Sequence, residues 1–187
     1  MTTNNAVDNG LTGATGSGNF AGSTSPTFVT PVLGAATATS VAFSPTTGGI
    51  VGTATNDNAS AGKVGEFVSS QVVFASRVNV TAQNTPQDVT SISLTAGDWD
   101  IHGGINFLAN ASTSTSYISW CSATSATLPD LSLVSQTSVT GIGNCSLTTQ
   151  VLRVSLASPG TAYLTAYATF SAGNPQVSGF ISARRVR

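Results

Sequence analysis

A strict alternation of apolar and polar side chains restricts residues 98–108 to one kind of structure. The stretch reads DWDIHGGINFL. Successive side chains of a β-strand point to opposite faces of a sheet, so this period of two predicts a strand that is buried on one side. The adjacent glycines Gly103 and Gly104 indicate a bulge or a close approach by a neighbouring strand. The buried face is predicted to hold Trp99, Ile101, Ile105 and Phe107, and the solvated face Asp98, Asp100, His102 and Asn106.

Similar segments recur over residues 63–187. Turn signals rich in Gly, Pro, Asn or Asp separate them at intervals of roughly eight to fifteen residues, and no stretch keeps a helical period for more than about two turns. We therefore predict an all-β domain, an antiparallel and jelly-roll-like β-sandwich of about eight strands. A closed barrel is the competing architecture. In the strand expected at 162–170, the inward side chains are Leu164, Ala166, Ala168 and Phe170.

Residues 1–62 have a different composition, rich in Gly, Thr, Ala, Ser and Asn, with isolated apolar residues. Three prolines, Pro26, Pro31 and Pro45, exclude regular helix and central strand there. We predict a thin shaft or linker segment, with disorder as the alternative. Such a segment is too thin to bury its own larger apolar side chains, so association with partner chains would have to cover Phe20, Phe28, Val29, Val32 and Leu33.

Charge is scarce: only 7% of the residues are charged, and the formal net charge is -1. No basic block exists to follow a phosphate backbone, so we expect no nucleic-acid binding. The sequence contains no run of about 20 apolar residues, so we expect no membrane insertion. The first residues lack the pattern of a signal peptide, so we expect synthesis in the cytoplasm. The two cysteines, Cys121 and Cys145, are expected to be buried free thiols more readily than a disulfide.

Two parts of the chain resemble bacteriophage tail fibre proteins. The stretch GSGNFAGSTSPTFVTPVLGAATATSVAF is similar to a repeat of tail fibre shafts, and TNDNASAGKVGEF, VTSISLTAGDWDI and ISARRVR are similar to a terminal domain of predicted phage tail proteins. The resemblance implies a homotrimeric fibre tip that continues the rest of the fibre, lies in the virion and binds the host surface. It supplies no binding residues. Three copies wound about one axis would also bury the apolar residues of the shaft.

The sequence offers little for catalysis. Asp98 and Asp100 would point to one strand face about 6–7 Å apart, a spacing compatible with glycoside hydrolysis, but we expect them on a solvated surface after a turn. His102 is the only histidine, and no GxSxG motif occurs. We therefore expect no enzyme, no cofactor and no metal site.

Receptor recognition is expected on aromatic faces or long loops. Sugars present apolar patches ringed by hydroxyls, which suits aromatic side chains beside polar groups. The aromatic candidates are Tyr117, Tyr163 and Tyr167, each on the face opposite the apolar set of its strand; a subunit interface is the alternative for Tyr163 and Tyr167. We favour the loops at 108–116, 122–130 and 134–144, expected at one end of the sandwich, with Asn110 and Asp130 as candidates.

The last residues include three arginines, Arg184, Arg185 and Arg187. Pairing with carboxylates of a neighbouring chain is expected in preference to binding an anionic surface such as lipopolysaccharide phosphate.

The leading hypothesis is a trimeric, non-enzymatic phage tail fibre tip that binds a host polysaccharide or outer-membrane receptor. The alternatives are a structural protein that trimerises and caps the fibre, a glycan-degrading tail spike fragment, and a secreted lectin-like adhesin.

Replacing Phe28 with Ser tests the shaft hypothesis. We expect Phe28→Ser to weaken assembly while it leaves the folding of residues 63–187 nearly unchanged, because it removes apolar area only from the shaft. Sedimentation and thermal unfolding of the full chain measure the two effects. Unchanged stability of the oligomer would contradict burial of the shaft residues.

Overall fold

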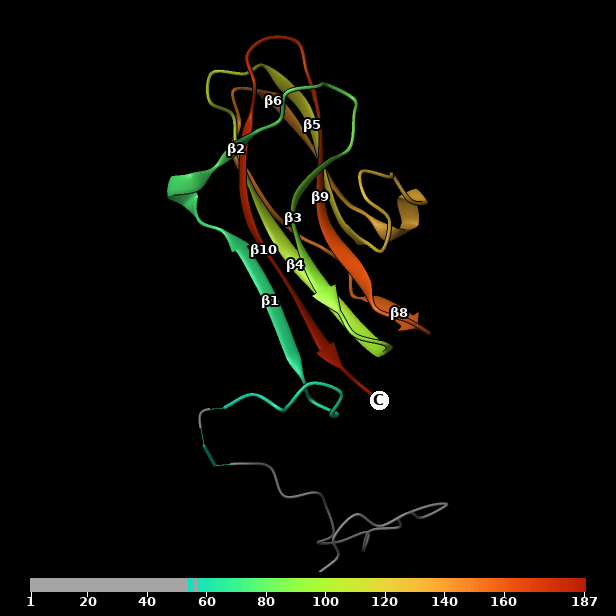
Figure 1. Cartoon of the computed structure of the whole chain (residues 1–187). Coiled ribbons are helices and arrows are strands. Elements are labelled where there is room, and N and C mark those ends of the chain that lie inside the picture. Colours follow the sequence, from blue (N-terminus) through green and yellow to red (C-terminus); the bar gives the residue numbers. More distant parts are fainter. Residues whose placement is uncertain (1–53, 56) are drawn as a thin grey trace, which may run out of the picture. The chain divides into compact units, whose positions relative to one another are not determined.

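The described residues of this computed structural model, 54–55 and 57–187, form an all-β fold (Figure 1). They all belong to one compact unit, residues 53–187. Among them, no helical element is long and apolar enough to cross a membrane. The strands are β1 (Phe67–Val72), β2 (Val78–Asn79), β3 (Gln87–Leu94), β4 (Gly97–Leu108), β5 (Ser114–Ser122), β6 (Ser135–Gly141), β7 (Cys145–Thr148), β8 (Leu152–Leu156), β9 (Gly160–Phe170) and β10 (Gln176–Arg185), with short 3₁₀ turns at Phe74–Ser76 and Leu131–Leu133.

The strands form two antiparallel sheets. One has the order β1-β10-β4-β7, with β2 also on β10 and β8 also on β4, and the other has the order β3-β9-β5-β6. Since β7 and β8 pair with successive parts of β4, and β1 and β2 with successive parts of β10, each of these two pairs fills one position of the first sheet. Eight strand positions then divide four and four between two sheets, with the connectivity of a jelly roll. The predicted antiparallel sandwich is confirmed, and the competing closed barrel is not observed.

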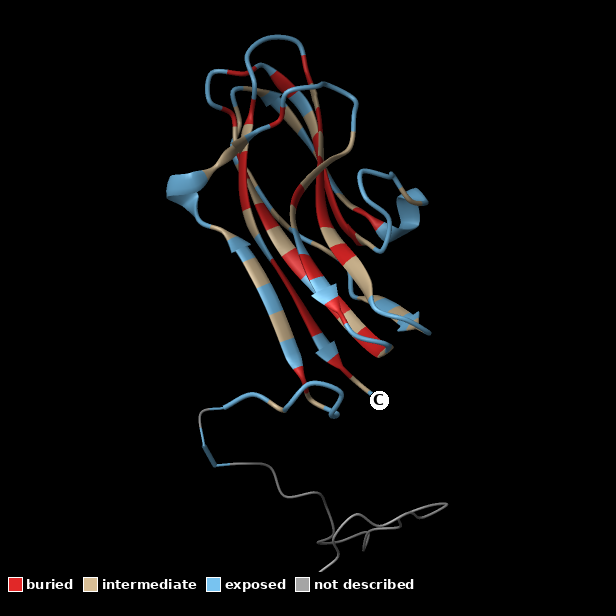
Figure 2. Ribbon diagram, in the orientation of Figure 1, coloured by how far each residue is buried: buried red, intermediate tan, exposed pale blue. Residues whose placement is uncertain are grey.

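A single large apolar core lies between the sheets. The predicted alternation in β4 and β9 is confirmed on the inner face, where Trp99, Phe107 and Leu164 are fully buried. Figure 2 shows the buried positions recurring along β4 and β10, with less buried positions between them. The interior is therefore defined by every second residue of the central strands, and the remaining residues of these strands must face outwards.

Two glycines let a leucine of the opposite sheet reach the backbone. A Cβ atom on Gly103 would lie 2.4 Å from the carbonyl oxygen of Phe180, and one on Gly179 would lie 2.5 Å from that of Gly104. Both positions also face the side chain of Leu164, at 3.0 and 3.1 Å. The register between β4 and β10 is unbroken, and the predicted close approach is confirmed. On the other edge of β4 the register shifts by one residue between the pairs Ile101–Leu152 and Gly104–Thr148, so an irregularity is also present there.

The outer face of the four-stranded sheet is partly covered by the segment between β5 and β6. Trp120 donates its indole N–H to the carbonyl of Thr127 at 3.0 Å and packs with Ile118 and Val134 in a second small cluster. The Asp88 carboxylate holds the same segment, accepting hydrogen bonds from Ser125 Oγ at 2.6 Å and the Ala126 N–H at 3.0 Å. Both faces of β5 are consequently buried.

A buried ion pair joins the start of the domain to its last strand. Arg185 donates to the Glu66 carboxylate at 3.0 Å and to the Ala96 carbonyl at 2.8 Å, and it lies over the ring of Trp99. Burial raises the pKa of Glu66, but hydrogen bonds from the Gly62 N–H and Arg185, with the charge of that arginine, bring the pKa below its usual value.

The other two terminal arginines differ from Arg185. Arg187 contacts the buried carboxylate of Asp98, whereas Arg184 is exposed on the outer face. Two of the three arginines therefore pair with carboxylates of their own chain. The stretch just before β1, which we expected to belong to a linker, is also attached: Asn58 exchanges side-chain hydrogen bonds with both backbone groups of Phe67.

Adjacent arginines provide a matched test of the buried pair. Arg185→Ala should lower the free energy of unfolding by about 3 kcal/mol, because it leaves Glu66 buried without its partner, while Arg184→Ala should change it by less than about 0.5 kcal/mol. Chemical denaturation measures both. Equal effects of the two substitutions would contradict the role assigned to the pair.

The same pair predicts a pH dependence. Because the pKa of Glu66 is lower in the folded chain than its ordinary value of 4.5, the stabilisation by this ion pair is present above that pH and is lost as the pH falls through the folded pKa. Denaturation midpoints of the native chain should fall more steeply below pH 4.5 than those of Arg185→Ala. Parallel curves for the two proteins would exclude this contribution.

Candidate functional site

Tyr117 is not available to a receptor, and its prediction as a binding residue is wrong. Its side chain is 0% exposed and stacks on Phe107 with ring centroids 4.5 Å apart. Its hydroxyl donates to the carbonyl of Gly143 at 3.2 Å. The cause is that β5 carries apolar residues on both faces, and the face holding Tyr117 and Cys121 is the one that meets the main core.

Tyr163 and Tyr167 do face outwards, on the outer side of the four-stranded sheet, where both are half-buried. The Tyr167 hydroxyl lies 3.3 Å from Asn84 Oδ1, and its ring packs against the small cluster of Ile118 and Trp120. Much of its surface is thus used within the chain, so this pair provides only part of an aromatic surface.

Asn110 and Asp130 are both exposed but lie beyond opposite ends of β5. Asn110 belongs to a group of loops at one end, where its side chain donates to the Asn174 carbonyl at 3.4 Å. Asp130 precedes the 3₁₀ turn, and hydrogen bonds from the hydroxyl and the backbone N–H of Ser132 lower the pKa of its carboxyl group. The predicted receptor residues therefore do not form one site. The predicted interface residues Phe20, Phe28, Val29, Val32 and Leu33 lie outside the described residues.

The carboxylates of Asp98 and Asp100 both contact arginine side chains. The Asp98 side chain is only 7% exposed, so its predicted place on a solvated surface is wrong; Arg153 approaches it at 3.5 Å and Arg187 also contacts it. Asp100 is half-exposed, and the same Arg153 lies 3.8 Å from it. Sequence alternation correctly put both on the outer face of β4 but did not reveal their partners, which come from distant strands.

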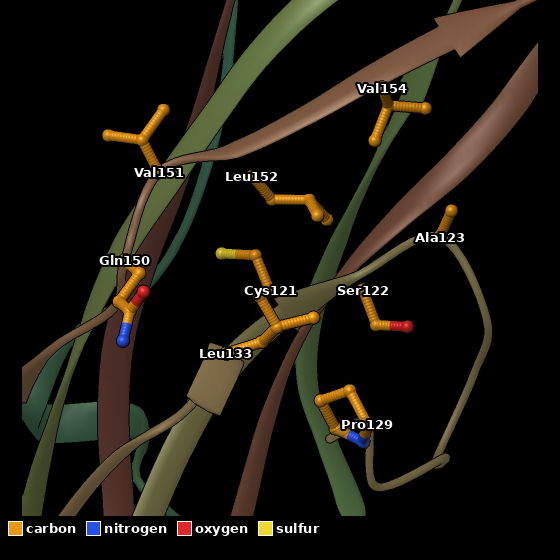
Figure 3. Close-up of a pocket in the computed structure, with 9 residues that line it drawn as sticks. All are labelled: Cys121, Ser122, Ala123, Pro129, Leu133, Gln150, Val151, Leu152 and Val154. Carbon is orange, nitrogen blue, oxygen red and sulfur yellow. The ribbon is translucent and has the colours of Figure 1, made fainter. Parts of the chain in front are cut away.

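A small apolar pocket lies beside Cys121, between the segment after β5 and strand β8 (Figure 3). Its volume is about 140 Å³, well below the 300–1,000 Å³ or so that is typical of ligand pockets. Figure 3 shows Cys121 between Leu133 and Leu152. Burial raises the pKa of the Cys121 thiol to about 11, so this cysteine is unsuited to act as a nucleophile.

A better candidate is the outer face of the six-stranded sheet, which we call the Phe180 face. It consists of outward side chains of β1, β4 and β10, because the pleat directs their alternate residues into the core. Phe180 is 43% exposed and stands near the middle of this face, with its ring over Gly104. The residues that define the Phe180 face are Phe67, Gln71, His102, Asn106, Phe180 and Ser182.

Two hollows flank Phe180. The first, of about 520 Å³, lies between Phe67, His102 and Phe180 and has Ser182 in its lining. The second, of about 390 Å³, includes Gln71, Asn106 and the exposed ring of Phe74. Phe180 and Gln71 line both hollows. Each has the volume of a site for a small ligand.

The lining is aromatic and hydrogen-bonding but carries no carboxylate, lysine or arginine. Nε2 of His102 lies 3.3 Å from the Ser182 hydroxyl oxygen. The imidazole also meets the Phe180 ring edge-on, with ring centroids 6.3 Å apart. Within the described part of the chain, the side chains of Ser69 and Gln71 have no hydrogen-bond partner. The face therefore combines exposed aromatic rings with polar groups free to bind a ligand.

Sequence reasoning did not identify this face, although a signal was present. Alternation in QVSGFISARRVR puts Phe180 on the same side as Ser178 and Ser182, opposite the apolar set of that strand. The pairing that brings Phe67 and His102 to flank this strand is non-local and has no such local signal.

No family model matches the chain, and the search of curated proteins found no match. Among residues 54–55 and 57–187, no group of three or more potential metal ligands is present.

Thiol modification tests the environment of Cys121. At pH 8 a pKa of about 11 leaves about one thiol in a thousand ionised, so an alkylating reagent should modify Cys121 far more slowly in the native chain than in urea. Half-buried Cys145, whose pKa burial also raises, serves as the internal comparison. Peptide mass spectrometry gives both rates, and equal rates for Cys121 in the two conditions would contradict its burial.

Proposed function

We propose that this chain is the tip of a bacteriophage tail fibre and that its jelly-roll head binds a receptor on the host cell surface. The observation that carries the proposal is the uncharged, hollowed and aromatic Phe180 face. The resemblance of several sequence stretches to tail fibre proteins supports it from a separate direction. The fold alone does not define the function, since jelly rolls serve many roles.

The burial of Asp98 and its contacts with arginine favour recognition of a receptor over cleavage of a glycan. Glycoside hydrolysis requires one carboxylic acid and one carboxylate flanking a bound sugar. Here the Asp98 carboxylate is buried and Arg153 and Arg187 both contact it, so it is poorly placed to reach a substrate.

Trimerisation would make weak sites effective. In the proposed fibre, the segment that contains Phe20, Phe28, Val29, Val32 and Leu33 joins three chains and continues into the rest of the fibre. Three copies of the Phe180 face would then be presented together in the virion. Once one site is engaged, the effective concentration of the others raises the overall affinity without any new contact.

A capping or assembly role is the second candidate, and the exposed rings of Phe67, Phe74 and Phe180 favour it. Exposed apolar groups gathered on one surface also mark subunit interfaces. In this alternative the Phe180 face meets a neighbouring chain, and the substitution that removes Phe180 destabilises the oligomer.

Binding of the fluorescently labelled full chain to a panel of bacterial cells tests the proposal. We expect saturable binding to some strains and loss of most of it in Phe180→Ser, because the receptor contact is removed from an exposed position. Val151→Ser, at an exposed apolar residue that lines neither hollow, is the control and should bind as the native chain does.

Sedimentation of each variant separates the two candidates. An unchanged oligomer with lost binding supports receptor recognition. Dissociation of the oligomer in Phe180→Ser supports the capping role, and binding to no strain in the panel contradicts the proposed function.

A further inference from the structure

We propose that the Phe180 face binds one linear, uncharged oligosaccharide that runs along β10 through both hollows. This inference rests on the proposed function and adds to it the chemical class, the length and the position of the ligand.

The first argument is the continuity of the two hollows. Phe180 and Gln71 line both, so no wall of other residues needs to separate them. The lining follows β10 from Ser182 in the first hollow to Ser178 in the second. Four residues of strand span about 13 Å. A ligand that uses both hollows is therefore elongated, and it passes over the ring of Phe180.

The second argument is that the ring of Phe180 is held in place. A Cβ atom on Gly104 would lie 3.2 Å from Cε1 of Phe180, so the absence of a side chain there makes room for the ring. His102 meets it edge-on from β4. The exposed side chain of Phe67, on β1, lines the first hollow together with Phe180 and His102. Fixed aromatic rings suit the C–H faces of pyranose units, which are the apolar patches of an oligosaccharide.

The third argument is the supply of hydrogen bonds. Ser69 and Gln71 contribute a hydroxyl and an amide that no hydrogen bond engages within the described residues. Asn106 donates its amide group to Ser146 Oγ at 2.9 Å, which leaves its carbonyl oxygen as an acceptor. Hydroxyls and amides both donate and accept, so they match the hydroxyl groups of a sugar without a need for charge.

The fourth argument concerns charge. The nearest charged row on this face holds Arg184, which lies between Phe67 of β1 and Asp100 of β4, so the row at the edge of the first hollow contains both signs. Arg77 stacks on Phe74 at 4.1 Å and donates to Gln176 at 3.0 Å. No lysine or arginine lines either hollow. A phosphate or carboxylate bound there would therefore find no lysine or arginine in the lining to pair with, which favours an uncharged ligand.

Calorimetric titration of the full chain with defined oligosaccharides tests the inference. The probes are neutral oligomers of glucose, galactose, mannose and N-acetylglucosamine, each as the monosaccharide and the tetrasaccharide, with oligogalacturonate as the anionic comparison. We expect at least one neutral series to bind, with an affinity that rises about tenfold or more from monosaccharide to tetrasaccharide as the second hollow is filled. The oligogalacturonate should bind at least tenfold more weakly.

Substitutions then locate the site. Phe180→Ala should reduce the affinity by about tenfold, the loss expected for one aromatic stacking contact. Gln71→Ala, on an exposed residue of the edge strand β1, gives a second reading that does not depend on the stability of Phe180→Ala. Val151→Ala, at an exposed residue that lines neither hollow, should bind as the native chain does.

Several outcomes would overturn the inference. They are tighter binding of the anionic oligomer, an affinity independent of chain length, and unchanged binding in both Phe180→Ala and Gln71→Ala. If cells are bound through Phe180 but no neutral oligomer binds, the inference fails while the proposed function stands. If neither cells nor oligomers are bound, both fail.

Discussion

The pleat of the central strands is the constraint on which the rest of this structure depends. Each residue that β4 and β10 direct into the core forces its neighbours onto the outer face. Trp99, Phe107 and Ile181 fill the interior, and Leu164 of the opposite sheet reaches the backbone because Gly103 and Gly179 have no side chains. Phe180 follows Gly179 directly, so the contact that brings the sheets together also fixes the position of the exposed ring.

The two outer faces of the sandwich differ in how far other segments of the described chain cover them. The segment after β5 lies over part of the four-stranded sheet, held by Asp88 and by the indole of Trp120. Around Phe180 on the six-stranded sheet, the described residues leave two hollows with exposed aromatic rings and free polar groups. This asymmetry points to the Phe180 face as the surface where a ligand or partner would bind.

Sequence alone predicted what depends on neighbours along the chain. Alternation gave the strands and inner residues of β4 and β9 correctly, because each residue of a strand with one apolar face has only two sides to choose from. It failed for Tyr117, since both faces of β5 are apolar and only the packing of the sheets decides between them. It placed Asp98 on the outer face correctly but did not reveal the burial of this residue, because Arg153 and Arg187 approach it from distant segments. The Phe180 face was missed for the same reason: its members come together only through the pairing of β1, β10 and β4.

The most direct test of this account measures whether the Phe180 face is open in the assembled protein. The full chain would carry 4-fluorophenylalanine at position 180, and its ¹⁹F signal would be followed by NMR as a soluble paramagnetic agent is added. A free binding face predicts strong relaxation of the signal in the proposed trimer, as large as the relaxation in the isolated chain. A signal protected in the oligomer but relaxed in the isolated chain would place Phe180 in a subunit interface and contradict the account.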